Sequence, residues 1–533
     1  MKNYFSIKNN AIAAMAFFAL LVTSCTMGPS ATDTIPSNSQ IVGSVDLMSL
    51  AKKGDLAHWE DLNSMKAVSS ALDNESKELK EMWNEVLANP ENTGIDLSKD
   101  VYFFMVNDNA SEQYSGLTFL LKDEAKFRSL LEKLGKESND ALIIDQVNGH
   151  NVVKVSPEVI MSWNQTHFLV LAATNYVSRS ILEDKSDRLL SLEKSNSVND
   201  ISSFKQFVKH SKDINIWLSG SSLKPFISKM PQYAGMAFSL DECAFTGYLD
   251  FKDGEITIDS KAYYSSQVIK DFNLDKDMVF DKDLFKTVPK DNFAMMGLTL
   301  DMDMFESSMK KESAFEMIDQ QCQKQCGVNF STALKSFNPS MLLTLSDVNQ
   351  IEIGRYGRKS TMPELNLAMS LNTAEDHQWL KDLLAKHTQY SNNGYYQLTV
   401  SEGIDVYFDL NDHHLVITNS EQNIKIATGK STAPSFDDSK LVSHFQKTPY
   451  FIYLDADYNH FTESMKAVIE NEFPPYQRDF ISGDKAIFKD AEITMLDNTV
   501  GSLSIRMKDK DENSLKQIIT LVDDNIAQLG MGL

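Results

Sequence analysis

Alternation of apolar and polar side chains is the most frequent pattern along this chain. It recurs in many short stretches, including residues 395–407 and 492–506. Such alternation predicts antiparallel sheets with one covered face and one face open to water. Stretches of helical periodicity lie between the strands, for example at residues 124–134 and 374–387. Because turns join consecutive strands more often than helices do, we predict the α+β class, with helices packed on antiparallel sheets.

The same series of patterns occurs twice along the chain. A stretch that begins at Ile35-Pro36 and runs through an alternating strand to Asp46 resembles the stretch from Val288-Pro289 to Asp301. Further strands and helices follow in the same order in both halves, which predicts two tandem copies of one unit. We place the first copy at residues 39–275 and the second copy at residues 276–533.

An acidic residue follows a predicted strand and precedes a predicted helix at three places, Asp46, Asp301 and Asp455. Ser221 stands near the equivalent place in a fourth instance. A carboxylate at such a junction is typical of an N-cap, because it accepts hydrogen bonds from the free N–H groups of the first helical turn. We therefore interpret Asp46, Asp301 and Asp455 as structural helix caps.

The N-terminus has the order of features found in secretory signals. Lys2 and Lys8 are basic, and residues 11–22 then carry no charged or polar side chain. A membrane-spanning helix needs about 20 apolar residues, so this run suits the apolar region of a signal peptide. Val22-Thr23-Ser24-Cys25 follows and resembles the bacterial lipobox, which implies cleavage after residue 24 and lipid, such as palmitate, on Cys25. The alternative is an ordinary signal peptide that happens to precede a cysteine.

Small, polar and proline residues follow Cys25, so we expect residues 25–38 to hold the lipidated cysteine and a flexible linker. Two or three acyl chains would anchor the protein stably, which makes the membrane its first expected partner. Thr26, and not aspartate, follows Cys25. By analogy with lipoprotein sorting, this favours the outer membrane. No run of acidic residues follows Cys25, so the sequence carries no signal for display on the cell surface. The expected location is the cell envelope, facing the periplasm.

The composition supports folded domains and excludes one class of partner. The chain is 42% hydrophobic and 10% aromatic, which is enough for apolar cores. Its formal net charge is −23, and removal of Lys2 and Lys8 with the signal peptide lowers it to −25. Phosphate binding needs a basic face, and the sequence has no cluster of lysine and arginine. We therefore expect no nucleic-acid partner.

Three cysteines remain after Cys25, and their number is odd. Cys322 and Cys326 are four residues apart, a spacing that places both sulfurs on one face of a helix. They could form a local disulfide in an oxidising periplasm, although helical Cα atoms at this spacing lie near the upper limit for a bridge. The state of Cys243 is open. No cysteine has the spacing of a zinc site.

No motif in the sequence predicts a metal, a cofactor or a catalytic nucleophile. The segment Asp455-Ala-Asp457-Tyr-Asn459-His460 resembles the start of a calcium loop. However, His460 and Lys466 occupy the positions where such a loop needs glycine and glutamate. His413 and His414 stand at a predicted turn without a third ligand. Glycine-rich phosphate loops and the common nucleophile signatures are missing from the sequence.

The lipobox, the Ile35-Pro36 start with its strand-acid-helix pattern and the two-copy body resemble the Bacteroidota lipoproteins grouped as domain-of-unknown-function family 4836. The resemblance covers nearly the whole mature chain. It implies an envelope lipoprotein, and it supplies no known activity and no catalytic or binding residues.

Two classes of function remain open. The first is a non-enzymatic binding or interaction module whose partner is an envelope protein or a glycan, held in a groove between sheet and helices. Duplication favours this class, because two similar halves make a long surface. The alternative is an envelope or polysaccharide hydrolase that uses acidic residues in a cleft between the repeats. Two close acids with raised pKa values would indicate the enzyme, and a groove without them would indicate binding. The sequence favours binding.

Overall fold

The computed structural model of the protein describes residues 29–66, 81–82, 84–86, 89–107, 113–137, 142–173, 179–227, 240, 242–271, 273–310, 315–353, 358–391, 393–401, 404–439, 441–474, 478, 481–483 and 486–528. The chain divides into two compact units. Unit 1 consists of the stretches Met1–Phe226, Ser239–Tyr263 and Asp511–Leu533, and unit 2 of the stretches Ile227–Phe238 and Tyr264–Lys510. The predicted signal peptide, residues 1–24, and Cys25 lie outside the described residues.

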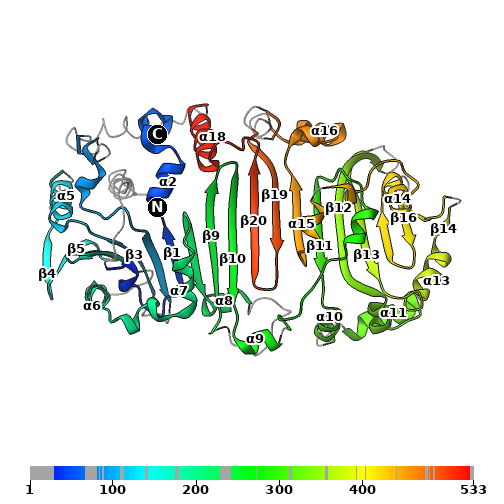
Figure 1. The fold of residues 1–533 in the computed structure, drawn as a ribbon, viewed down its shortest axis with the longest axis horizontal. Coiled ribbons are helices and arrows are strands. Elements are labelled where there is room, and N and C mark those ends of the chain that lie inside the picture. Colours follow the sequence, from blue (N-terminus) through cyan, green and yellow to red (C-terminus); the bar gives the residue numbers. More distant parts are fainter. Residues whose placement is uncertain are drawn as a thin grey trace. The chain divides into compact units, whose positions relative to one another are not determined.

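Unit 1 is built on antiparallel strands that pair side by side (Figure 1). In order of pairing, the strands are β4 (Ile144–Val147), β5 (His150–Ser156), β6 (Val159–Trp163), β7 (His167–Ala173), β3 (Gln113–Leu120), β2 (Val101–Asn107), β1 (Ile41–Val45), β8 (Ile214–Ser219), β9 (Ala244–Lys252) and β10 (Glu255–Tyr263). Burial alternates along β2, where Tyr102, Phe104 and Val106 are buried and the residues between them are exposed. The two faces of this sheet therefore differ in burial, although the exposed Phe103 and Met105 of β2 are apolar as well.

Helices pack on both faces of the unit 1 sheet, although Phe103, Met105 and Leu117 stay partly exposed on one face. The helices are η1 (Ala31–Thr34), α2 (Leu47–Lys53), η2 (Leu56–Asp61), η3 (Pro90–Thr93), α5 (Glu124–Glu137), α6 (Arg179–Leu190), η4 (Lys194–Asn196), η5 (Val198–Asp200), α7 (Ser202–Lys209), α8 (Gly220–Ile227) and α18 (Ser514–Gln528). One apolar core joins Phe204 of α7 to Trp217 of β8. A second core joins Phe127 of α5 to Phe119 and Phe168. Neighbouring residues of a strand point to opposite faces, so the two cores lie on opposite sides of β3 and β7.

Unit 2 has the same order of strand pairing as unit 1, with each label higher by ten. The strands are β14 (Gln389–Tyr390), β15 (Tyr396–Ser401), β16 (Ile404–Leu410), β17 (His414–Thr418), β13 (Arg358–Leu371), β12 (Phe337–Ile353), β11 (Ala294–Thr299), β18 (Tyr450–Asp455), β19 (Phe488–Met495) and β20 (Val500–Met507). All of these pairs are antiparallel. Both units thus combine an antiparallel sheet with helices, and the predicted α+β class is confirmed.

The helices of unit 2 differ more from those of unit 1 than its strands do. They are α9 (Ser266–Asp271), η7 (Lys282–Thr287), α10 (Met302–Met309), α11 (Phe315–Cys326), α12 (Phe330–Lys335), α13 (Gln378–His387), α14 (Glu421–Ala427), η8 (Phe436–Asp438), α15 (Val442–Phe445), η9 (Tyr458–His460) and α16 (Glu463–Glu472). In Figure 1, α14 lies over the strands near β16. Its Ile424 belongs to the main core of unit 2, which also contains Phe445 and Phe451.

Equivalent backbone hydrogen bonds support the predicted duplication. Ser219 N–H donates to the carbonyl of Gln40 at 2.9 Å, where β8 ends beside the start of β1. At the same place in unit 2, Asp455 N–H donates to the carbonyl of Phe293 at 2.8 Å. Strand order and hydrogen-bond register therefore agree between the two units at these sites, and the predicted tandem duplication stays a prediction.

The structure corrects the expected extent of the linker. Residues 31–34 form η1, which Ser30 caps by accepting a hydrogen bond from Thr32 N–H. Ile35 is fully buried in the main core of unit 1. Thr34 lies with its hydroxyl oxygen 2.9 Å from that of Thr118 on β3. The composition of this stretch indicated a flexible tether, but its small and threonine side chains pack and hydrogen-bond inside the fold. Residues 31–35 therefore belong to the folded body.

The compact units also differ from the predicted copy boundaries at the C-terminus. Helix α18 belongs to unit 1, although the sequence places it in the second copy. The carboxylate of Asp523 accepts hydrogen bonds from Asn63 N–H at 2.7 Å and from Ser64 N–H at 2.8 Å. Ser514 donates its hydroxyl to the carbonyl of Glu255 at 3.0 Å. A sequence repeat and a compact unit therefore end at different residues here.

Candidate functional site

The three predicted helix caps have different roles in the structure. Asp46 caps α2 and accepts a hydrogen bond from Ser49 N–H at 2.9 Å. Asp301 accepts from Met304 N–H at 3.1 Å at the start of α10. Asp455 ends β18 but caps neither following helix, because Asp457 caps η9 and Thr462 caps α16. Asp455 instead faces a pocket, so its interpretation as a helix cap is corrected.

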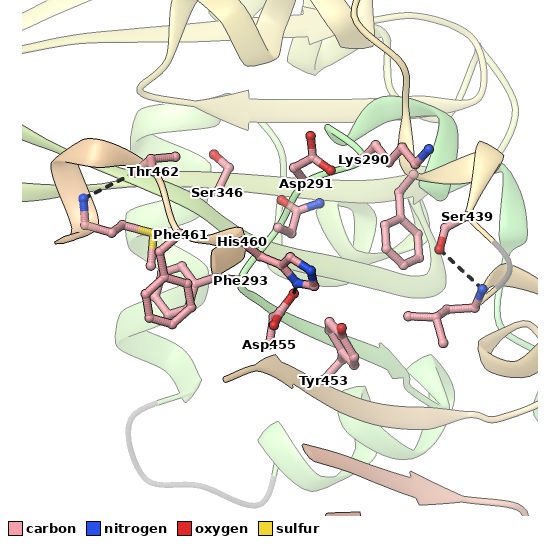
Figure 2. A pocket seen from close by; sticks show the side chains of 14 residues that line it. Lys290, Asp291, Phe293, Ser346, Ser439, Tyr453, Asp455, His460, Phe461 and Thr462 are labelled. Atoms are coloured by element: carbon pink, nitrogen blue, oxygen red, sulfur yellow. Dashed lines mark hydrogen bonds and ion pairs between the residues drawn. The ribbon is translucent and has the colours of Figure 1, made fainter. Parts of the chain in front are cut away.

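This pocket lies within unit 2 and has a volume of about 430 Å³ (Figure 2). The loop before β11, the end of β18 and the segment from η9 into α16 form most of its wall. The lining residues are Lys290, Asp291, Asn292, Phe293, Ser346, Phe436, Ser439, Leu441, Tyr453, Asp455, His460, Phe461, Thr462 and Met465. The volume falls within the range typical of small-molecule sites, about 300–1,000 Å³.

A histidine lies between two carboxylates at the pocket. Nδ1 of His460 lies 2.7 Å from Oδ2 of Asp455, and Figure 2 shows the two side chains pointing toward one another. Because an ionised carboxylate can only accept, this nitrogen carries the proton. Nε2 of His460 lies 4.0 Å from Asp457. The imidazole is thus already engaged by acids, and not by a hydroxyl that it could activate.

Asp457 is held in its charged form. Burial alone would raise the pKa of its carboxyl. The hydrogen bond from Asn459 N–H at 3.1 Å, the Lys508 ammonium at 3.5 Å and the nearby His460 act against burial. Together they keep the pKa of Asp457 below its ordinary value. This carboxyl therefore does not act as a general acid near neutral pH.

A buried charge network lies beside the pocket on β19 and β20. Asp490 and Glu492 are 6% and 4% exposed. Arg506 donates to Asp490 at 2.6 Å and to Glu492 at 2.8 Å, and His444 also contacts Glu492. Tyr453, opposite Glu492 in the strand register, lines the pocket. Burial, and then the charges of the neighbouring acids, raise the pKa of Tyr453 far above its ordinary value, so its phenol keeps its proton.

Asn292 has an unfilled hydrogen-bonding position. Its side chain is 6% exposed and lines the pocket. Its Nδ2 donates to the carbonyl oxygen of Pro289, which fixes the orientation of the amide, because a carbonyl needs a donor. Within the described residues, Oδ1 of Asn292 is buried and has no hydrogen-bond partner. A buried acceptor without a donor is costly, so the fold holds this atom at some expense of stability.

Apolar side chains complete the wall. The rings of Phe293 and Phe461 lie 6.1 Å apart, centre to centre. Phe436 and Met465 are buried and also line the pocket. The pocket therefore offers aromatic and aliphatic surface together with a few fixed polar groups, which is the usual composition of a small-molecule site.

The equivalent place in unit 1 has a different connection between strand and helix. Helix α8 begins directly after β8, and Gly220 N–H donates to the carbonyl of Cys243 at 2.8 Å. A Cβ atom on Gly220 would lie 1.9 Å from the carbonyl oxygen of Leu240. Ser39, at the place of Asn292, donates its hydroxyl to the carbonyl of Pro36 at 2.7 Å. In unit 2, residues 456–462 separate β18 from α16, and the pocket lies beside them.

The other predicted site residues lie away from this pocket. Cys322 and Cys326 lie on α11 as free thiols, so their disulfide stays a prediction. Burial, and then the nearby Cys326, raise the pKa of the Cys322 thiol. Cys243 is free and buried. Cys25 lies outside the described residues, so its lipidation also stays a prediction.

Histidine and acidic residues were also considered as metal ligands. His413 and His414 lie at the turn between β16 and β17, as predicted, where Asn411 Oδ1 accepts both of their N–H groups at 2.9 and 3.0 Å. In the described part of the chain, no group of three or more histidine, cysteine, aspartate or glutamate residues is arranged to hold a metal ion. Nor does any helix there have the length and apolarity to cross a membrane.

The sequence interpretation missed Asn292 and Tyr453. A signal for Asn292 was present in the aligned repeats, where Lys290-Asp291-Asn292 stands in place of Ser37-Asn38-Ser39. Serine can fill one hydrogen-bonding position of the turn, whereas asparagine can fill it and present a second polar atom. No such local signal marks Tyr453, because its burial depends on strands distant in the sequence.

Comparison with known proteins shows the family of the chain. Residues 31–515 match the family described as Domain of unknown function (DUF4836), and the chain belongs to this family. No curated protein matches the chain.

Among solved structures, crystal forms I and III of TP0453 match with 12% and 10% sequence identity and TM-scores of 0.25 and 0.26. These matches cover 46% of this chain and 87% and 88% of the respective TP0453 chains. TM-scores this low carry no conclusion about fold or function.

Proposed function

We propose that this protein is a lipoprotein of the cell envelope that acts as a non-enzymatic binding module. Lipid on Cys25 anchors it to the outer membrane, facing the periplasm, and the pocket of unit 2 binds its ligand. The observation that carries the binding role is the pocket of about 430 Å³ in unit 2, whose wall combines aromatic side chains with a few polar groups.

The start of the folded body supports an anchor close to the membrane. Ala31 is buried in the core of unit 1, six residues after Cys25. An extended chain of six residues spans at most about 20 Å. A lipid on Cys25 would therefore keep the start of unit 1 within roughly this distance of the bilayer surface.

The acids at the pocket support binding over hydrolysis. Acid catalysis needs a carboxyl group that keeps its proton near neutral pH. Asp457 has a lowered pKa and an ion pair with Lys508. Asp455 already accepts hydrogen bonds from Asp457 N–H at 2.9 Å and from His460. These carboxylates are therefore suited to orient groups around the pocket.

The anchor is tested by acyl labelling in the native host. Cells that produce the tagged chain would be fed an alkyne-bearing palmitate, with the Cys25→Ser variant as the control. We expect label and membrane association in the wild type and neither in the variant. Equal labelling of both chains would refute lipidation at Cys25.

The binding role is tested by recovering the tagged protein from its own envelope in mild detergent. We expect a defined envelope component to co-purify with the wild-type chain and to be absent from a control purification that uses an unrelated tagged lipoprotein. Turnover of an envelope polymer or polysaccharide by the purified chain would refute the non-enzymatic role.

A further inference from the structure

We propose that the pocket of unit 2 binds a small organic cation, an ammonium group on an aliphatic body. This inference rests on the proposed binding function and names the class of ligand. It is carried by a carboxylate that is partly open to the pocket, by the charge balance of the lining and by the aromatic side chains around it.

Asp455 supplies a fixed negative charge to the pocket. It lines the pocket, and its side chain is 15% exposed, so a ligand can reach it. Asp457 N–H donates to Oδ1 of this carboxylate at 2.9 Å, and Nδ1 of His460 lies 2.7 Å from Oδ2. A carboxylate has about four acceptor positions, so these two bonds orient the group and leave positions for a further donor.

The charges of the lining favour a cation over an anion. Among the described lining residues, Asp455 and Asp291 are acidic and Lys290 is basic, which leaves one negative charge in excess while His460 is neutral. Lys290 and Asp291 are adjacent and both exposed, so water screens them, whereas Asp455 is partly buried. A second anion beside a partly buried carboxylate is costly, and an ammonium there makes a charge-assisted hydrogen bond.

The aromatic wall suits the same class of ligand. The rings of Phe293 and Phe461 lie 6.1 Å apart, and both residues are partly exposed. Tyr453 also lines the pocket, and burial raises the pKa of its phenol, so the ring adds no second negative charge. A cation within about 6 Å of an aromatic face is attracted by the ring. The aliphatic body of the ligand would pack against Phe436 and Met465.

The test is calorimetric titration at pH 8, where imidazole side chains are generally neutral. The mature chain is held in micelles of an uncharged detergent. Each cation is paired with a neutral analogue of similar shape, choline with 3,3-dimethylbutan-1-ol and butylamine with butan-1-ol. We expect at least one cation to bind about tenfold or more tightly than its analogue. Binding of neither cation, or equal binding of each cation and its analogue, would overturn the proposal.

The decisive variant is Asp455→Asn, which keeps the shape of the side chain and removes its charge. We expect the affinity for the cation to fall by about tenfold or more, as for loss of a hydrogen bond to a charged group. Glu463→Gln is the matched control. It makes the same change of charge beside the lining residue Thr462, on a side chain that is 92% exposed and does not line the pocket.

This control should stay within about twofold of the wild-type affinity, because water and salt screen an exposed charge. Unchanged affinity in Asp455→Asn, or equal losses in both variants, would overturn the proposal. Thermal unfolding shows whether each variant folds. If Asp455→Asn does not fold, the comparison of each cation with its neutral analogue on the wild-type chain decides.

A free amine and a lipid headgroup share this chemistry, and two further probes distinguish them. Preference for ethanolamine over phosphoethanolamine would indicate a free amine, and the reverse preference would indicate a headgroup. Both results support a cation site. If no cation binds but the tagged chain still recovers a defined envelope component, the cation proposal fails and the binding function stands.

Discussion

The inner faces of the two sheets differ in chemistry although the backbones correspond. Trp217 of β8 lies opposite Thr246 of β9, and Tyr453 of β18 lies opposite Glu492 of β19. The equivalent positions are Trp217 and Tyr453, Thr246 and Glu492, Ala244 and Asp490, and Tyr263 and Arg506. Unit 1 carries aromatic and small residues at these positions, and unit 2 carries a phenol and a charge network.

This difference gives the equivalent positions different roles. In unit 1 they stabilise the core, and in unit 2 they can contact a ligand. In unit 1 the ring of Trp217 meets Phe204 edge to face at 5.8 Å, and the strand ends directly in α8. In unit 2 the chain leaves β18 through residues 456–462, next to the pocket. A duplicated scaffold can keep one copy for packing while the second copy carries polar groups at a stability cost.

The largest expected effect is on packing in unit 1. Trp217→Ala removes a 2% exposed side chain from the main core, and we expect the free energy of unfolding to fall by about 3–5 kcal/mol. Tyr453→Phe, at the equivalent position of unit 2, removes one hydroxyl and should cost far less. Chemical denaturation monitored by fluorescence would measure both. Equal losses would remove the proposed division between the two inner faces.

The next effect concerns the charge network of unit 2. Arg506→Met would leave Asp490 and Glu492 buried without their common partner, and we expect a loss of about 2–3 kcal/mol at neutral pH, discounted because Arg506 is partly exposed. Chemical denaturation at pH 7 measures the loss. A loss below about 0.5 kcal/mol would mean that the two buried acids do not depend on Arg506.

The third prediction concerns the closed place in unit 1. Gly220→Ala would put a Cβ atom 1.9 Å from a backbone carbonyl oxygen, so the segment around Leu240 must move. We expect a loss of about 1–3 kcal/mol, typical of overpacking. Ala456→Gly, at the residue after β18, is the matched change in unit 2 and should stay within about 1 kcal/mol. Thermal unfolding of both variants tests whether this place is sterically filled in unit 1.

The smallest expected effect is the pH dependence that Asp457 contributes. Its pKa in the folded chain lies below the ordinary value of 3.8, so folding favours the charged form. This contribution is present above about pH 4 and is lost as the pH falls through the lower, folded pKa. Asp457→Asn should therefore reduce the loss of unfolding free energy at acidic pH, by less than about 1 kcal/mol. Lys508→Met should reduce this acid-dependent loss as well. An unchanged pH dependence of the unfolding free energy in both variants would contradict the ion pair.

Alternation of apolar and polar residues predicted an antiparallel sheet, although β2 is apolar at nearly every position and only its burial alternates. Burial in β2 alternates at Tyr102, Phe104 and Val106, because side chains of a strand point to opposite faces whatever the rest of the fold does. The cap at Asp46 was predictable for a similar reason, since capping depends on residues within one helical turn. Asp455 has the same local pattern, but the longer connection after β18 gives it other partners.

The packing of the predicted linker and the pocket depend on contacts between distant parts of the chain. The composition of a short stretch does not predict such contacts. Ile35 is buried beside Val198, far along the chain, so nothing in residues 31–38 alone indicates a core segment. The pocket brings residues 290–293 together with β18 and with α16. No short stretch of sequence holds this combination.

The sequence by itself determined the α+β class, the doubled order of elements and the position of Cys25, because periodicity, repetition and short motifs are properties of neighbouring residues. Only the tertiary structure decided that Ile35 belongs to the core, that α18 packs with unit 1 and that Asn292 is buried with an unfilled acceptor. Burial and the pairing of polar atoms are set by segments that meet after folding. This is the physical reason that the pocket of unit 2 could not be located before the fold was known.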